Sequence, residues 1–424
     1  MVSKEVYDCY TSLLKSELKE ATGCTEPIAL ALAAARARQE LGCLPEKVEV
    51  RCSGNIIKNV KAVVVPNSGG KKGIKTAALL GIVAGDADAS LQVISHVSDE
   101  GRKALDEALQ NIKVTVLLAE DVPPLYILVK VTKGSETAEA EISGSHTNFS
   151  LIKKNGKVVY AHQCDSSEDG AAIPTDLMNI DDIIEYAETV DLNDVRETIE
   201  RQIRDNTAIS NEGLKNKWGE SVGQTLLAIH SNDIIARARA AAAAGSDARM
   251  NGCAMPVVIN SGSGNQGMTV SLPVIEYARE MKVDHDTLIR ALVLSNLIAL
   301  HQKKYIGYLS AYCGAVSAAA GAGCAICWLR GGNRDEIAAT LVNAMATIGG
   351  MVCDGAKSSC AGKISLSVDA ALQGMYMAER GLRYRPGEGI VKNDDDETVK
   401  AVGRMGREGM KGTDLEILNI MLED

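Results

Sequence analysis

The stretch Y-I-G-Y-L-S-A-Y-C-G-A-V-S-A-A-A-G-A-G-C-A-I-C-W-L, residues 305–329, carries no charged side chain and consists mainly of Ala, Gly, Ser and Cys. Its length would be enough for a helix to cross a bilayer, but these small residues are only weakly apolar. Small side chains all around a helix are typical of a helix that is packed on every side. The stretch therefore predicts a tightly packed central helix of a soluble domain rather than a membrane span.

Around this stretch, helical periodicity dominates from about residue 175 onward, while the first part of the chain mixes helix and strand patterns. Two helices are expected within 1–42, the second with Thr25 as N-cap and an end near Gly42. Further patterns predict a helix over 73–85, a hairpin at Asn155-Gly156 and strands at 47–53, 61–67, 112–118, 125–131 and 139–143. We therefore predict an α+β N-terminal domain over residues 1–170, followed by a mostly α-helical C-terminal domain over 171–424. The polar segment 163–171 is the expected boundary.

Composition excludes several classes of protein. The 424-residue chain is acidic, with a net charge of −10, and only 3% of its residues are aromatic. Without a basic run it does not match a nucleic-acid-binding protein. Its eleven cysteines are irregularly spaced, and its first twenty residues resemble an amphipathic helix rather than a leader, so a reducing cytoplasm fits best. The expected partner is a small-molecule substrate, with no nucleic acid and no membrane, and a homo-oligomer is compatible with the sequence.

Three cysteines in the C-terminal part carry the strongest chemical signal. Cys313 lies in C-G (313–314), and Cys353 and Cys360 delimit C-D-G-A-K-S-S-C. Three thiolates can hold three corners of an iron–sulfur cluster and leave the fourth iron open to a substrate, as a Lewis acid. That arrangement favours lyase chemistry. Three buried structural cysteines are the alternative, and zinc matches the spacing less well.

A second pair, Cys324 and Cys327 in C-A-I-C, shares one face of the predicted central helix. The segment is apolar on all sides, and no positive or capping residue lies beside the pair. A redox-active pair of this spacing usually begins a helix, where the dipole lowers the thiol pKa. We therefore interpret both residues as core packing.

Cys24, in G-C-T-E-P (23–27), directly precedes the predicted N-cap of the second helix. The positive end of a helix dipole favours the thiolate, which can act as a base or a nucleophile when it is partly exposed. A small buried cysteine is the equally simple reading of this residue.

The glycine-rich loop N-S-G-S-G-N-Q-G (260–267) is the strongest loop signal. Its glycines let backbone N–H groups converge on an anion, and a carboxylate is expected because the spacing of a dinucleotide or Walker motif is missing. Side-chain donors in the loop are Ser261, Ser263, Asn265 and Gln266. A second donor loop, S-G-N with Ser53 and Asn55, is expected to close the other side of the site. His146 is a further candidate for substrate binding, although a lone histidine more often has a structural role.

Together these motifs resemble the iron–sulfur L-cysteine desulfidases, which share their helical half with the alpha chain of bacterial iron–sulfur L-serine dehydratases. The motifs that carry the resemblance are G-C-T-E-P (23–27), S-G-N-I-I-K-N-V (53–60), N-S-G-S-G-N-Q-G (260–267), C-G-A (313–315) and C-D-G-A-K-S-S-C (353–360). The resemblance implies a [4Fe-4S] cluster, with one iron open to substrate, on Cys313, Cys353 and Cys360. It also implies that Cys24 acts as acid or base near that iron, in the conversion of L-cysteine and water to sulfide, ammonia and pyruvate.

Two other functions compete with this one. L-serine dehydration is the same elimination with hydroxide as the leaving group. A non-enzymatic iron–sulfur sensor of oxygen or iron is the candidate from another class. Cys24 and the anion loop favour an enzyme, because a sensor needs neither a poised thiol nor a substrate cradle.

Overall fold

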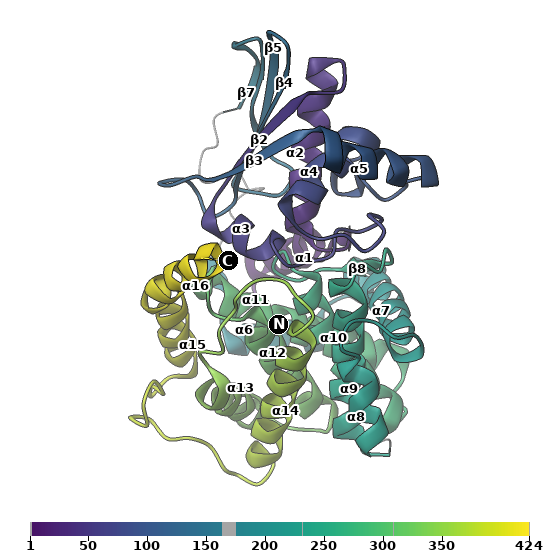
Figure 1. The fold of residues 1–424 in the computed structure, drawn as a ribbon. Coiled ribbons are helices and arrows are strands. Elements are labelled where there is room, and N and C mark those ends of the chain that lie inside the picture. The colour runs from purple at the N-terminus through teal and green to yellow at the C-terminus, as the bar shows by residue number, and fades with distance from the viewer. Residues whose placement is uncertain (1, 163–174, 231, 308, 424) are drawn as a thin grey trace.

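The structure is a computed structural model of the protein, and it describes residues 2–162, 175–230, 232–307 and 309–423. An N-terminal α/β body with a mixed sheet precedes a mostly helical body, which confirms the predicted fold class (Figure 1). The expected boundary at 163–171 lies outside the described residues. A division into two domains at residue 170 therefore stays a prediction.

The α/β body is built on a six-stranded sheet in the order β3-β2-β4-β5-β6-β7, in which β2 and β3 are parallel and all other neighbours are antiparallel. Burial alternates along β4, where Ile127, Val129 and Val131 are fully buried and the residues between them are partly exposed. This alternation is typical of a sheet with one covered face, and here α2 packs on that face. The elements are β2 (Lys47–Cys52), β3 (Lys113–Leu118), β4 (Tyr126–Lys133), β5 (Glu136–Ser143), β6 (Phe149–Lys154), β7 (Lys157–Ala161), α2 (Thr25–Leu41), α3 (Gly54–Val60), α4 (Gly73–Ala84) and α5 (Asp99–Asn111).

One predicted strand is wrong. Residues 61–67 form a loop that follows α3, a short helix which sequence reasoning missed. Val63 and Val65 of this loop are fully buried, so their apolar character reflects burial under helices and not pairing in the sheet. The run ends at Pro66 and turns at Asn67 with a φ of 58°, which prevents it from continuing as a strand. The other predicted strands, the 73–85 helix and the hairpin at Asn155-Gly156 are confirmed.

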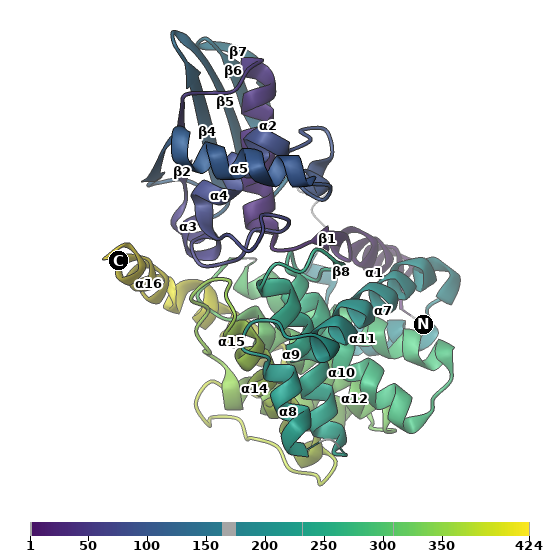
Figure 2. The same cartoon turned by 45° about the vertical axis from the view of Figure 1, so that its right-hand side comes forward.

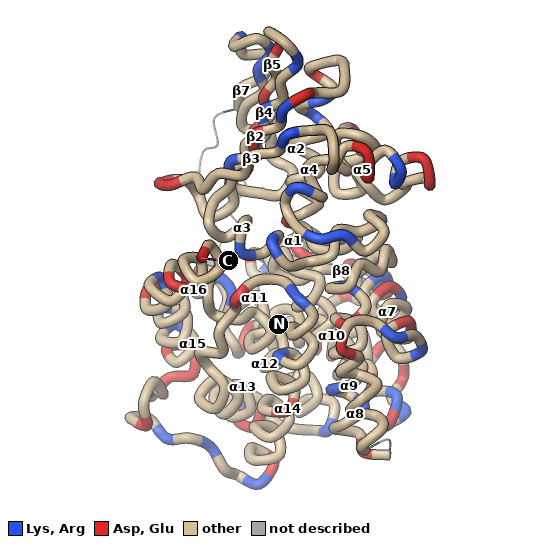
Figure 3. Tube along the Cα trace, in the orientation of Figure 1, with Lys and Arg blue, Asp and Glu red and all other residues tan. Residues whose placement is uncertain are grey.

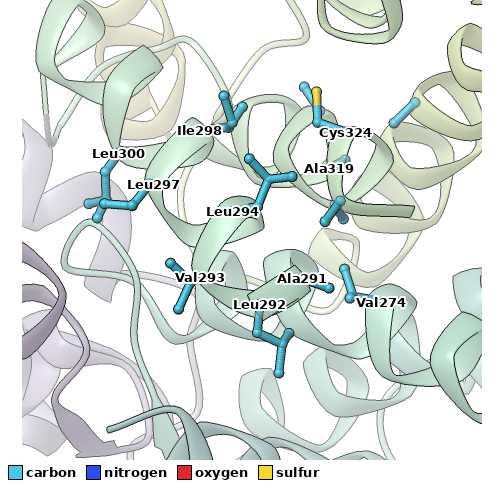
Figure 4. Close-up of a cluster of buried hydrophobic side chains, with 14 of the residues drawn as sticks. Val274, Ala291, Leu292, Val293, Leu294, Leu297, Ile298, Leu300, Ala319 and Cys324 are labelled. Carbon is cyan, nitrogen blue, oxygen red and sulfur yellow. The ribbon is translucent and has the colours of Figure 1, made fainter. Parts of the chain in front are cut away.

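The helical body surrounds α12 (Gly314–Leu329), which contacts α10 (Gly264–Met281), α11 (His285–Ile306), α13 (Arg334–Ile348) and α14 (Cys360–Ala378). All residues from Ala315 to Cys327 are buried. The predicted central helix is confirmed but is shorter than the uncharged stretch, because α11 ends at Ile306 and Gly307, with a φ of 92°, separates the two helices. Figure 4 shows Leu294 and Ile298 of α11 in the buried cluster with Cys324 of α12.

Charges of both signs are interspersed over the outer elements of both bodies, whereas α12 carries none (Figure 3). Within the described residues, no helix combines the length and the apolar character needed to cross a membrane. The remaining elements of the helical body are α6 (Ile180–Thr189), α7 (Leu192–Lys215), α8 (Val222–His230), α9 (Ile234–Met250), β8 (Pro256–Val258), α10 (Gly264–Met281), α11 (His285–Ile306), α13 (Arg334–Ile348), α14 (Cys360–Ala378), α15 (Asp395–Arg404) and α16 (Lys411–Glu423), with a π-helical turn at Met405–Gly409 and a short 3-10 turn at Thr175–Leu177. A second 3-10 turn, Ser90–Gln92, lies between α4 and α5 of the α/β body.

The first and the last helix of the chain both contribute to the contact between the two bodies. The first helix, α1 (Lys4–Glu17), packs on α6, α7 and α11 of the helical body, and the following β1 (Glu20–Thr22) pairs with β8 (Figure 2). In the opposite direction, α16 extends from the helical body and contacts α3 (Figure 1). The motifs singled out in the sequence lie at this junction, as their contacts show below.

Candidate functional site

Cys313 and Cys353 are held side by side by the backbone. Tyr312 and Val352 form an isolated antiparallel bridge. The Cys313 N–H donates to the Met351 carbonyl at 2.9 Å, and the Cys353 N–H donates to the Ala311 carbonyl at 2.6 Å. The two thiol groups share a hydrogen bond. Cysteines from two separate segments are thus brought into direct contact.

Cys360 is the first residue of α14 and interacts electrostatically with both other cysteines. The loop between Cys353 and Cys360 turns at Gly355, which has a φ of 95°. A Cβ at this glycine would lie 2.2 Å from the Lys58 carbonyl oxygen. The loop is therefore in direct contact with α3 of the α/β body. Only glycine fits both this φ angle and the short distance to the Lys58 carbonyl.

Lysines lie near the three sulfurs, and two of them are paired with carboxylates, Lys58 with Asp414 and Lys363 with Asp354. The hydrogen bond from Cys313 lowers the pKa of Cys353 to about 6 against the effect of burial, with Lys58 and Lys363 contributing. The same hydrogen bond, together with burial, raises the pKa of Cys313. Lys303 is buried close to both sulfurs, and burial lowers its pKa to about 8. The two cysteines and nearby lysines thus lie together in a buried setting.

The three cysteines offer the ligand type of an iron–sulfur cluster. Among the residues that the structure describes, no three His, Cys, Asp or Glu side chains are arranged to hold one ion. Cysteine thiolates are the usual ligands of [4Fe-4S] clusters, and a cluster with three of them carries net negative charge. Here Cys313 is the N-cap of α12 and Cys360 begins α14, so two helix N-termini and the nearby lysines offset that charge.

Cys24 is the N-cap of α2, which corrects the expectation that Thr25 has this position. Its side chain makes no capping hydrogen bond, and its thiol instead donates to Glu26 Oε2 at 2.9 Å. Burial raises the pKa of Cys24, and the charge of Glu26 raises it further. Cys24 is buried next to an acid, so the partial exposure that a reactive thiolate needs is not seen, and the helix dipole is opposed by the charge of Glu26.

The loop 260–267 lies beside the Cys24 segment. The Thr25 hydroxyl donates to the Gly262 carbonyl at 3.3 Å. Arg249, which is buried, donates to the Gly23 carbonyl at 3.1 Å and to Asn265 Oδ1 at 3.2 Å. These contacts join the first motif to the glycine-rich loop.

Gln266, in the first turn of α10, connects the loop to the cysteines. A Cβ at Gly314, the residue after Cys313, would lie 2.4 Å from Gln266 Cδ. The Gln266 Oε1 atom is buried and has no hydrogen-bond partner among the residues that the structure describes, and the same is true of Asn55 Oδ1 on α3. Buried polar atoms are normally hydrogen-bonded, so these two side chains are suited to a bound ligand.

The other predicted residues have partners within the protein. The Ser53 hydroxyl donates to the Pro124 carbonyl at 2.6 Å and Ser261 donates to Asn260 Oδ1 at 2.9 Å. Ser263 caps α10. His146 is close enough to Glu26 to lower the pKa of that carboxyl. Outside the site, Cys324 and Cys327 are fully buried.

Comparison with known proteins now places the chain in a family. A family model described as "Serine dehydratase alpha chain" matches residues 88–419, well over half of the sequence. The chain belongs to the serine dehydratase alpha chain family. The relation to this family that the motifs predicted is thereby confirmed. Membership indicates a lyase-type, dehydratase-like enzyme, from a family that in general depends on iron–sulfur.

Relatives cover nearly the whole chain. A "UPF0597 protein" of Finegoldia magna is 48% identical over 415 residues, which is 98% of this chain and 99% of that protein. A "UPF0597 protein" of Lachnoclostridium phytofermentans is 46% identical over 417 residues, covering 98% of this chain and 100% of the relative. A "UPF0597 protein" of Treponema denticola is 41% identical over 430 residues, covering 100% of both.

In this member of the serine dehydratase alpha chain family, four helix N-termini meet around the cysteines. They belong to α2, α10, α12 and α14. Thr25 of α2 contacts Gly262 just before α10, Gln266 of α10 lies next to Gly314 of α12, and Cys313 at the start of α12 interacts with Cys360 of α14. Helix N-termini attract anions because their N–H groups are unpaired and their dipoles are positive. The arrangement is suited to a small anionic substrate beside a negatively charged cluster.

Sequence reasoning missed Glu26, Lys58 and Asn59, although all three lie inside the quoted motifs. Glu26 accepts hydrogen bonds from Cys24, Thr25 and Asn59. A signal was present, because Asn55, Lys58 and Asn59 have the i, i+3, i+4 spacing that puts side chains on one helix face. Recognising 54–60 as a helix would have grouped them.

Proposed function

We propose that this protein is an L-cysteine desulfidase, a cluster-dependent carbon–sulfur lyase that converts L-cysteine and water to sulfide, ammonia and pyruvate in the cytoplasm. The observation that carries the proposal is the position of Cys24. It forms a small buried cluster with Val63 and Met250, and Cys360 packs against that cluster. A thiol suited to proton transfer thus lies beside the predicted cluster ligands, in a chain from a lyase family.

Cys313, Cys353 and Cys360 would hold a [4Fe-4S] cluster. When bound, such a cluster supplies a Lewis acid that polarises the substrate. The lysines near the three sulfurs would balance its negative charge. The remaining chemistry belongs to side chains of the chain itself.

The anion loop and the two amide side chains would bind and orient the amino acid. The N-terminus of α10 is suited to the substrate carboxylate. The unpartnered oxygens of Gln266 and Asn55 are suited to the α-ammonium group. With the substrate held in this way, Cys24 would accept the Cα proton and hydrosulfide would leave from Cβ. The aminoacrylate product tautomerises to an imine, which water hydrolyses to pyruvate and ammonia.

L-serine dehydration is the second candidate, because the matching family model is described by that activity. Anaerobic purification with an iron and sulfide assay, followed by kcat/KM for L-cysteine and for L-serine, separates the two. We expect a higher kcat/KM for L-cysteine, since hydrosulfide is a better leaving group than hydroxide. A higher kcat/KM for L-serine would show instead that the protein is an L-serine dehydratase.

Replacing Gln266 by alanine is expected to weaken substrate binding. A hydrogen bond to a charged group contributes about 1.5–3 kcal/mol, so KM for L-cysteine should rise by about one to two orders of magnitude while kcat changes little. The matched control is Gln92→Ala, which removes an exposed glutamine in the α/β body. An unchanged KM in Gln266→Ala would remove this residue from the substrate site.

A further inference from the structure

Glu26 is a buried carboxylate at the centre of the site, and the steps described so far give it no role. Its side chain is 8% exposed, in the first turn of α2. One oxygen, Oε2, accepts the Cys24 thiol at 2.9 Å and the Thr25 hydroxyl at 3.2 Å. The other, Oε1, accepts the Asn59 amide at 2.9 Å. Both oxygens are thus fixed by donors from two separate segments.

The surroundings keep this carboxylate charged. Burial acts to raise the pKa of Glu26, but the charge of His146 and the hydrogen bond from Cys24 hold it below the ordinary value. Arg249 acts in the same direction. A buried charge of this kind is costly unless it is paired and hydrogen-bonded, so the network is built around an ionised acid.

The proton on Cys24 needs an acceptor. A thiol is not a base, and Cys24 is a buried thiol that donates to a carboxylate oxygen. For Cys24 to take a proton from substrate, its own proton must first move to a group within hydrogen-bond reach. Glu26 Oε2 lies at that distance.

We infer that Glu26 is the positioning residue of Cys24: its carboxylate fixes the direction of the S–H bond and accepts the thiol proton during turnover. This inference rests on the proposed function. The Cys24 S–H proton moves to Glu26 Oε2, and the thiolate then takes the Cα proton of the substrate. The Cβ–S bond breaks with its electron pair on sulfur, Cys24 gives the proton that it took to the leaving hydrosulfide, and Glu26 returns its proton to Cys24. Cys24 is then a thiol and Glu26 a carboxylate again, so charges and protons balance.

Three variants of the full-length, cluster-loaded protein test the inference. Glu26→Gln keeps the shape but removes the charge, whereas Glu26→Asp keeps the charge but shortens the side chain. Glu20→Gln makes the same chemical change at an exposed glutamate of β1 and is the control. We expect Glu26→Gln to lower kcat by about 10²-fold or more, the scale of a lost proton-transfer group, with little change in KM. Glu26→Asp should keep more activity than Glu26→Gln, and Glu20→Gln should match the unmodified protein.

The order of the two Glu26 variants separates a role in proton transfer from a packing role. If Glu26 only filled space, the isosteric glutamine would be tolerated better than the shorter aspartate. Activity of Glu26→Gln equal to or above that of Glu26→Asp would therefore overturn the inference.

A spectroscopic measurement tests the hydrogen bond without turnover. The S–H stretching band of Cys24 is isolated as the infrared difference between the unmodified protein and Cys24→Ser. An amide oxygen accepts more weakly than a carboxylate, so the band should move to higher frequency in Glu26→Gln and stay in place in Glu20→Gln. If Glu26→Gln does not fold, Asn59→Ala removes one orienting bond instead, and a shifted band with reduced kcat is expected. An unmoved band in the folded variant overturns the inference.

Different results would contradict the proposed function and the role of Glu26. If the unmodified protein turns over neither L-cysteine nor L-serine, the proposed function is wrong, while the infrared band still decides whether Glu26 positions Cys24. If the unmodified protein is active and Glu26→Gln keeps its kcat, the inference alone is wrong.

Discussion

Replacing Cys353 by alanine is expected to abolish the cluster and all lyase activity. Cys353 shares a hydrogen bond with Cys313 and interacts electrostatically with Cys360. Two thiolates cannot hold three corners of a [4Fe-4S] cluster. Anaerobically purified Cys353→Ala should therefore be colourless, with iron and acid-labile sulfide near background and no detectable pyruvate from L-cysteine.

The matched control for this variant is Cys43→Ala, the same change at an exposed cysteine. It should be brown and fully active. The melting temperature of Cys353→Ala, compared with that of Cys43→Ala after its cluster has been removed, shows whether Cys353→Ala is folded. Full retention of iron and sulfide in a folded Cys353→Ala protein would contradict the ligand assignment.

Local patterns predicted much of the fold. The strand at 47–52 was found from its alternation of apolar and polar residues, and the hairpin was found from Asn155-Gly156, whose φ angles of 50° and 76° suit a tight turn. The buried loop at 61–67 was misread because a short apolar run has the same composition in a strand and in a buried loop. The packing of α1 on α6, α7 and α11 depends on contacts between distant segments, which no local pattern encodes.

The candidate site, too, depends on contacts that local sequence patterns do not predict. The motifs identified the cysteines, but the contact between Cys313 and Cys353 depends on the isolated bridge at Tyr312 and Val352, which has no local signature. Glu26 escaped notice for a different reason. An acidic residue in the first turn of a helix is common, because it complements the dipole. Only the structure shows that Glu26 is buried and receives the Cys24 thiol.

Replacing Cys24 by serine is expected to remove most turnover and leave the cluster intact. Serine is close in size to cysteine and can keep the hydrogen bond to Glu26, so the fold and the ligands at 313, 353 and 360 should be undisturbed. Its hydroxyl is a far weaker acid than a thiol, however, so it does not form the anion that takes the Cα proton. We expect kcat to fall by about 10²–10⁴-fold, the contribution of a positioned proton-transfer group. Iron content and colour should equal those of the unmodified protein.

Proton transfer at Cα can be measured apart from the loss of sulfide. L-alanine has no leaving group on Cβ, so exchange of its Cα hydrogen in heavy water reports proton removal alone. The unmodified protein should catalyse this exchange and Cys24→Ser should not, while Cys43→Ser, at the exposed cysteine, should behave like the unmodified protein. If Cys24→Ser loses turnover but still exchanges the Cα hydrogen, another group removes that proton, and Cys24 acts later in the reaction, on the leaving sulfide. An unchanged kcat would instead make Cys24 a packing residue, and Glu26 would then be a buried acid without a proton to accept.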